Sequence, residues 1–139
     1  MYPRPFLHFI RLFNDELFWE AHEVLEGPWR RCRSPFYKGI IIYASAFVHV
    51  QRGNPAGAWK QMGKVLNYLP PYRPGYMGLD VETILADARR CREQVQGRDD
   101  LRGDVNGLRA LVPFPRLDLR PEHLRGDEPE LLVEGGMRR

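Results

Sequence analysis

One histidine and three glutamates lie within seven residues near the start of the chain: Glu20, His22, Glu23 and Glu26. Residues four apart on an α-helix lie one turn above each other, so His22 and Glu26 can touch. Imidazole and carboxylate groups ligate metals and transfer protons. The cluster could therefore bind a metal, carry out acid–base chemistry, or join two helices through hydrogen bonds.

A metal site is the most specific of these interpretations. The segment from His22 to Glu26 follows the pattern H-E-x-x-E, which differs by one residue from the H-E-x-x-H zinc motif. In that motif the first and last residues ligate the metal, and the adjacent glutamate is the general base. On this pattern His22 and Glu26 are metal ligands, and His49 from a later helix is the third ligand. Glu23 or Glu20 would then be the catalytic base of a hydrolase-like enzyme that uses zinc, manganese or iron.

The same residues also fit a structural role. Buried polar groups are normally hydrogen-bonded, and His22 and His49 at helix interfaces would each find a carboxylate or a backbone carbonyl. Such a network costs desolvation but can fix which helices pair. We favour a non-catalytic binding or structural module with a buried His/Glu network over the enzyme, because most near-matches to short motifs are accidental. Both interpretations require the two histidines to share one half-buried seam between helices.

The helix that carries the cluster is expected to begin after Asn14, whose side chain can cap a free backbone N–H. Its apolar side is formed, at helical spacing, by Leu17, Phe18, Ala21, Val24, Leu25 and Trp29. Pro28 is expected to bend or end this helix. Trp19 falls outside the apolar stripe, so an exposed Trp19 would indicate a protein interface such as that of a homodimer.

Further helices are expected over residues 5–12, 36–52, 55–68 and 81–96. The segment 36–52 is apolar almost all round, which is typical of a central, buried helix. Gly53 suits the left-handed residue after its end, and Asn54 is expected to cap the next helix. Asp80 is expected to cap the helix over 81–96.

These patterns predict an all-α, single-domain bundle of about four to five helices. The helical bundle covers residues 1–97, and residues 98–139 form an irregular, partly extended C-terminal tail that packs on the bundle and frays near Gly135. A chain of 139 residues is long enough to bury a core without disulfides or metals.

Composition favours a soluble, cytoplasmic protein with no membrane partner. No N-terminal signal is recognisable, and no uncharged run is long enough to cross a bilayer. Cys32 and Cys91 lie far apart and are expected to be reduced thiols.

The arginine clusters Arg30–Arg33 and Arg89–Arg92 are interrupted and lack interleaved aromatic residues. Nucleic-acid association is therefore the weakest of the functions considered.

Two blocks of residues resemble a small helical family known only as a domain of unknown function (number 309). The first block consists of Phe13-Asn14, Phe18, Glu20 to Glu26, and Trp29, and the second of Lys38 to Ile41, Ala44, Ala46, His49, and Gly53 to Ala58. The resemblance covers Pro5 to Leu69, or to Leu85 at its widest. It implies an all-α bundle and no established activity. The glutamine usual in the second block is Ile42 here, which weakens any role for that position.

Overall fold

The structure, a computed structural model, describes residues 1–132, so the predicted fraying near Gly135 lies outside the described residues. The helices are α1 (Arg4–Asn14), α2 (Phe18–Cys32), α3 (Pro35–Gln51), α4 (Pro55–Tyr68), α5 (Val81–Val95) and α6 (Val105–Leu111). Two short strands, β1 (Gly75–Tyr76) and β2 (Leu79–Asp80), pair antiparallel between α4 and α5. Single 3-10 turns cover Pro70–Tyr72, Asp99–Leu101, Pro121–His123 and Pro129–Leu132.

The all-α prediction is confirmed, but the described part of the chain contains six helices and not four to five. The additional helix is α6, in the segment predicted to be an irregular tail. Asp104 caps it by accepting a hydrogen bond from the Gly107 N–H. A side-chain cap of this kind satisfies a free N–H of the first turn and so stabilises a short helix.

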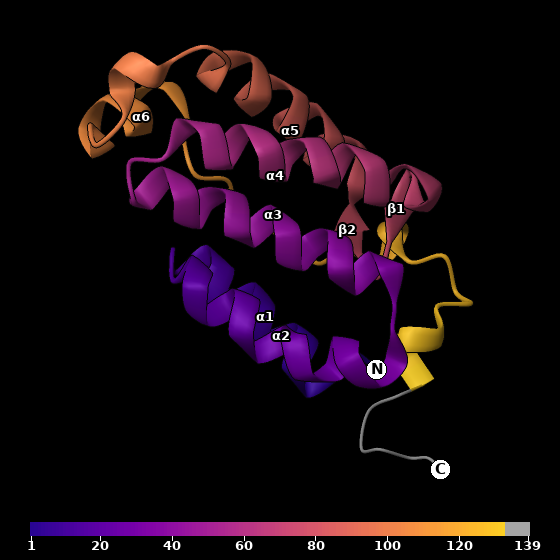
Figure 1. Ribbon diagram of the computed structural model, residues 1–139. Helices are drawn as coiled ribbons and strands as arrows, with labels where there is room; N and C mark the ends of the chain where they lie inside the picture. The colour runs from indigo at the N-terminus through magenta and orange to yellow at the C-terminus, as the bar shows by residue number, and fades with distance from the viewer. Residues whose placement is uncertain (133–139) are drawn as a thin grey trace.

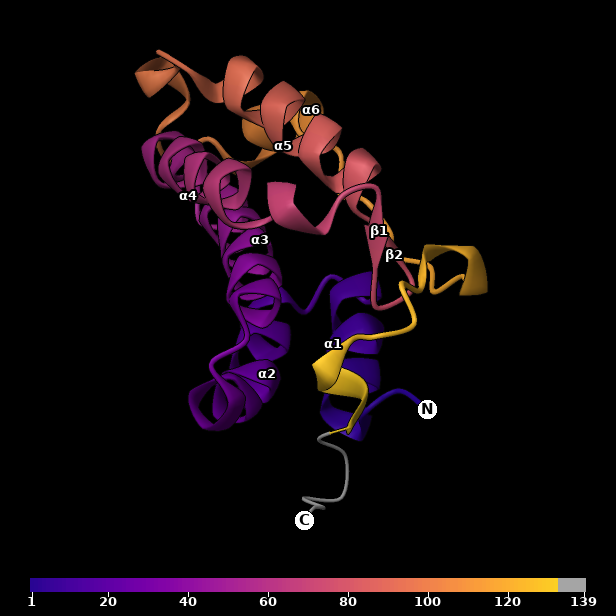
Figure 2. The ribbon, with the colours of Figure 1, turned by 90° about the vertical axis from the view of Figure 1, so that its right-hand side faces the viewer.

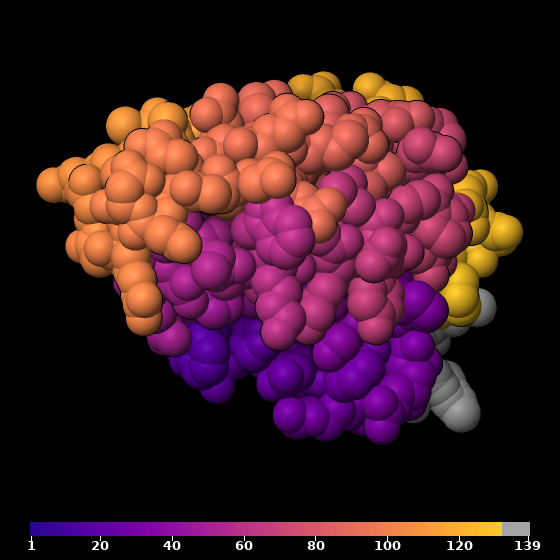
Figure 3. Space-filling view, turned by 45° about the horizontal axis from the view of Figure 1, so that its top comes forward, coloured from indigo at the N-terminus to yellow at the C-terminus, as the bar shows by residue number. Residues whose placement is uncertain are grey.

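The helices form two layers. The first layer consists of α2, α3 and α4, with α3 in the middle (Figure 1). The second consists of α1 and α5, with the two strands and part of the tail between them (Figure 2). In the space-filling view, α4 and α5 pack along each other across the visible face, with the α2–α3 segment below them (Figure 3).

The central position of α3 follows from its sequence. As predicted, nearly all of its side chains are buried, and a helix that is apolar all round must be covered on every side. Its inward side holds Tyr43, which stacks on Phe13 of α1 (ring centroids 5.5 Å apart), and Phe47, which meets the same ring edge to face (5.8 Å). Away from its two ends, solvent reaches only the side chains of Lys38, Ser45 and His49. These three recur at helical spacing and therefore lie on one outward side of α3.

Several predicted helix ends are confirmed. The backbone of Gly53 is left-handed, with φ of 70°. Asn54 caps α4 through the Gly57 N–H, and Asp80 caps α5 through the Thr83 N–H. In each case the local sequence contains both the cap and its partner, so no distant contact is needed to specify the boundary.

The predicted start of α2 is wrong, and so is an end at Pro28, whereas the alternative of a bend there stays a prediction. Asn14 is the last residue of α1, and α2 begins at Phe18 without a side-chain cap. Leu17 is 43% exposed and does not belong to the apolar side of the helix. Pro28 does not end α2, which continues to Cys32.

The described part of the tail is attached through two buried carboxylates. Glu130 accepts hydrogen bonds from the hydroxyls of Ser34 (2.5 Å) and Tyr76 (2.6 Å). Glu128 accepts from the backbone N–H groups of Met77 (2.8 Å), Arg125 (2.8 Å) and Gly126 (2.7 Å). A buried carboxylate is stable only when donors of this kind replace its hydration. Among the described residues, no helix is long and apolar enough to cross a membrane.

Candidate functional site

A groove lies between α2 and α4, with the outward side of α3 as its floor. A cavity of about 260 Å³ in this groove draws residues from all three helices: His22 from α2, Lys38, Ile41, Ile42 and Ser45 from α3, and Gln61, Lys64 and Tyr68 from α4. We call these eight residues the α3 groove. It contains one of the two histidines that the sequence singles out.

His22 is the least satisfied polar group of the α3 groove. Its side chain is 20% exposed, and its Nδ1 atom is buried without a hydrogen-bond partner among the described residues. Its Nε2 atom lies 3.8 Å from Oε2 of Glu26, which is too long for a hydrogen bond. The ring stacks on Trp19 with centroids 5.1 Å apart. An unpaired buried nitrogen costs about 1–3 kcal/mol, which a ligand that bonds to it could recover.

Other polar groups of the groove are fixed in place. The Gln61 amide donates to the Ser45 hydroxyl (2.6 Å), and this hydroxyl donates to the Ile42 carbonyl (2.6 Å). The chain of bonds links α3 to α4. The Lys38 ammonium lies 4.3 Å above the Trp29 ring. Lys64 is exposed and makes no ion pair within residues 1–132. The groove therefore presents cations above an immobile polar floor.

His49 lies on the same side of α3 but bonds to an amide and not to a glutamate. Its Nδ1 atom lies 3.1 Å from Nδ2 of Asn54, whose Oδ1 already accepts from the Gly57 N–H. The amide nitrogen must therefore donate, and Nδ1 accepts. Burial lowers the pKa of His49, and the positive charge of Arg52 lowers it further. The lowered pKa favours the neutral ring that this contact needs, and His49 does not line the cavity next to His22.

The structure does not bring the proposed metal ligands together. His22 and Glu26 meet, as their spacing predicts, but among residues 1–132 no group of three or more His, Cys, Asp or Glu residues is placed to hold a metal ion. Glu20 and Glu23, the proposed bases, are exposed on α2 and do not line the cavity. The donor set for zinc, manganese or iron is therefore limited to two residues of one helix turn.

Several arginines of the two clusters already have partners among residues 1–132. In the first, Arg30 pairs with Glu26 (3.3 Å) and Arg33 lies over the Trp29 ring (4.8 Å). In the second, Arg90 pairs with Asp87 (2.6 Å) and Arg92 lies 4.2 Å above the ring of Trp59. Each of these contacts would compete with a phosphate for the same guanidinium group, and weak nucleic-acid association stays a prediction.

Sequence reasoning missed the contribution of α4 to the site. The apolar spacing in 55–68 locates the side of α4 that faces the core, but Gln61, Lys64 and Tyr68 recur at i, i+3 and i+7 and form a second, polar stripe. That spacing was visible in the sequence and marks the side of α4 that faces the groove.

The fold and this site define an all-α protein with a cationic, polar groove over a buried central helix. Residues 6–61 match the family described as "Domain of unknown function (DUF309)". The resemblance seen in the sequence is thus confirmed over this segment. It spans most of α1, all of α2 and α3, and the first half of α4, and so includes every residue of the α3 groove except Lys64 and Tyr68. No curated protein and no solved structure matches the chain significantly.

Proposed function

We propose that this protein is a non-catalytic binding module whose α3 groove binds a small organic anion. The observation that carries the proposal is the buried Nδ1 atom of His22, which has no partner in the described part of the chain. The residue that carries this atom lines a cavity that also receives the side chains of Lys38 and Lys64. A negatively charged ligand could hydrogen-bond to Nδ1 of His22 and pair with the lysine ammonium groups.

The charge and size of the cavity support this class of ligand. Lys38 and Lys64 line it, and no carboxylate does. Ile41 and Ile42 supply an apolar wall for the rest of the ligand. A cavity of about 260 Å³ lies below the range of roughly 300–1,000 Å³ usual for drug-sized ligands. The ligand is therefore a small carboxylate or phosphate ester with a compact apolar group.

The groove lacks the arrangement that a nucleophilic enzyme needs. Ser45 is the serine that lines the cavity, but its hydroxyl donates to the Ile42 carbonyl and accepts from Gln61. A serine nucleophile must instead donate to a general base. Binding without catalysis is the function that this geometry supports.

The ring nitrogens of His22 give a direct test. Long-range ¹H–¹⁵N spectra of the imidazoles are recorded while benzoate or phenyl phosphate is added, with benzamide as the neutral counterpart. The anions are expected to shift the His22 nitrogens and to leave those of His123, which lies next to Asp80 and does not line this cavity, unchanged. Equal shifts with benzamide, or no shift with either anion, would contradict the proposal.

A matched pair of variants locates the charge. Lys64→Gln removes a cation from the cavity, whereas Lys60→Gln removes one that is also exposed on α4 but does not line it. Lys64→Gln is expected to weaken benzoate binding about two- to fivefold, the usual effect of one exposed charge pair. Lys60→Gln is expected to have no effect.

An exposed tryptophan favours self-association as a second candidate function. Trp19 is 45% exposed, and Leu17, two residues earlier, is 43% exposed. Neighbouring large apolar side chains in water are typical of an interface. If Trp19 and Leu17 form a homodimer interface, light scattering will show a dimer, and Trp19→Ala will dissociate it. The control Trp59→Ala, at a site 36% exposed on α4, will leave the dimer intact. A wild-type monomer would reject this function.

A further inference from the structure

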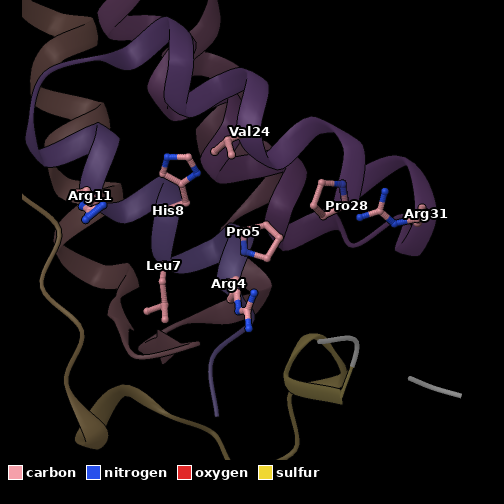
Figure 4. Close-up of a pocket in the computed structure, with 8 residues that line it drawn as sticks. All are labelled: Arg4, Pro5, Leu7, His8, Arg11, Val24, Pro28 and Arg31. Carbon is pink, nitrogen blue, oxygen red and sulfur yellow. The ribbon is translucent and has the colours of Figure 1, made fainter. Parts of the chain in front are cut away.

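A larger cleft lies between α1 and α2 and shares no residue with the α3 groove. Its volume is about 800 Å³, and it is lined by Arg4, Pro5, Leu7, His8 and Arg11 of α1 and by Val24, Pro28 and Arg31 of α2. Figure 4 shows these side chains, with His8 between the two helices and pointing toward Val24. We call it the α1–α2 cleft.

The cleft carries positive charge, and none of its lining residues in the described part of the chain is a carboxylate. Arg4, Arg11 and Arg31 are exposed, and none makes an ion pair within the part of the chain that the structure describes. Glu20, one turn before Val24 on α2, is not among the lining residues. Cations gathered in this way repel one another and attract an anionic partner.

Between the arginines the cleft is apolar. Val24 and Pro28 lie one turn apart on α2, and Pro5 and Leu7 of α1 also line the cleft. Leu7 is 42% exposed, although the other large apolar residues of α1, from Phe6 to Phe13, pack in the core. An apolar strip flanked by cations matches the two sides of an amphipathic helix, whose apolar stripe is bordered by polar residues.

We propose that the α1–α2 cleft binds an acidic amphipathic α-helix of a partner protein. The apolar stripe of the bound helix would cover Leu7, Val24 and Pro28, and its Asp and Glu side chains would pair with the arginines. From Arg4 to Arg11 the rise along α1 is about 10 Å, enough for two turns of a bound helix. This interaction is independent of the anion proposed for the α3 groove.

The apolar strip is what favours a helix over a nucleic acid. Phosphate contacts depend on cations alone and gain nothing from an exposed leucine. A helical peptide gains from both, because it buries Leu7 and pairs with the arginines. Substitution of the leucine therefore separates the two kinds of partner.

Selection from a displayed library tests the proposal. Helical peptides of about 14 residues, four turns long, are selected on the full-length protein, and enriched sequences are measured by fluorescence anisotropy. We expect enrichment of peptides with Leu, Ile or Met at i, i+3/i+4 and i+7 and with Asp or Glu on both flanks. Their affinity is expected to fall as the salt concentration rises.

Two neighbouring arginines provide a matched control. Arg31 lines the cleft, whereas Arg30 pairs with Glu26 outside it. Arg31→Gln and Arg11→Gln are each expected to weaken binding about two- to fivefold, and Arg30→Gln is expected to leave it unchanged. Leu7→Gln is expected to weaken binding at least as much as either arginine substitution. All four side chains are exposed, so thermal unfolding should be unaffected.

Three results would overturn the proposal. The first is a selection that yields no acidic amphipathic sequences. The second is equal loss of binding in Arg30→Gln and Arg31→Gln. The third is binding that Leu7→Gln leaves intact and that a short DNA duplex displaces, which would assign the cleft to nucleic acid.

Discussion

Asn14 and Leu117 exchange two hydrogen bonds across 103 residues of sequence. The Asn14 amide donates to the Leu117 carbonyl (2.9 Å), and the Leu117 N–H donates to the Asn14 side-chain oxygen (2.7 Å). The side chain thus acts like a peptide group of a neighbouring strand. It fixes the described part of the tail to the end of α1, close to the core position of Leu117.

We expect both Asn14→Ala and Asn14→Asp to destabilise the protein, because each breaks this exchange. An ionised aspartate has no N–H and cannot donate to the Leu117 carbonyl, so one of the two hydrogen bonds is lost. In a helix cap, where only an acceptor is needed, aspartate would serve as well as asparagine. The expected loss is about 1–3 kcal/mol in the free energy of unfolding, measured by denaturant titration. Asn67→Ala, at an exposed position of α4, is the control and should be nearly neutral. If Asn14→Asp is as stable as wild type, the hydrogen bond that the Asn14 amide donates does not contribute to stability.

Glu128 should make the attachment of the tail depend on pH. Burial acts to raise the pKa of its carboxyl, but the backbone N–H groups of Arg125, Met77 and Gly126 outweigh burial, so the pKa lies below its ordinary value of 4.5. A carboxyl whose pKa is lower in the folded than in the unfolded state stabilises the fold at pH values above its unfolded pKa. This stabilisation is lost as the pH falls through the folded pKa. The contribution is therefore complete above pH 4.5 and disappears in more acidic solution.

Glu128→Gln isolates this contribution. At pH 7 the substitution is expected to lower the free energy of unfolding by about 1.5–3 kcal/mol, because it removes hydrogen bonds to a charged acceptor. The difference between wild type and variant should shrink as the pH falls below 4.5. Glu122→Gln, at an exposed position of the same segment, should differ little from wild type at any pH. A difference that stays constant down to pH 2 would contradict the assignment.

The features that sequence reasoning predicted correctly are those whose cause is local. The burial of α3 follows from its all-round apolarity, and the caps Asn54 and Asp80 bond to N–H groups three residues away. The contact between His22 and Glu26 likewise follows from one turn of helix. In each case the residues that interact are close in sequence, so spacing alone specifies the geometry.

The features that were missed depend on partners far away in the sequence. Asn14 was assigned to a cap because asparagine at a helix boundary usually caps, but its partner Leu117 is in the tail. Glu130 was assigned no role, since a glutamate in a polar segment is normally solvated. It is buried because Ser34 and Tyr76, 96 and 54 residues earlier, supply its donors. No local pattern encodes pairings of this length.

The same distinction applies to the site. Sequence spacing placed His22 and His49 on two helices that do pack together, but it could not tell which neighbour each ring would choose. Asn54 follows His49 closely and caps α4, so it is already oriented to donate to that ring. Among residues 1–132, Nδ1 of His22 has no hydrogen-bond partner. Helical spacing thus predicted which helices carry the two histidines, whereas the packing decided the partner of each ring.

The environment of His49 predicts how its ring should titrate. Burial lowers its pKa from 6.5, and the charge of Arg52 lowers it further. The midpoint measured from its ring protons by NMR should therefore lie below 6.5, and Arg52→Gln should raise it without restoring 6.5, because burial is the larger cause. Since the unfolded chain binds this proton more readily, stability should fall as the pH drops below 6.5. Arg30→Gln, distant in sequence and paired with Glu26, should leave the midpoint unchanged. A midpoint at or above 6.5 would mean that the ring is not held neutral as the acceptor for Asn54.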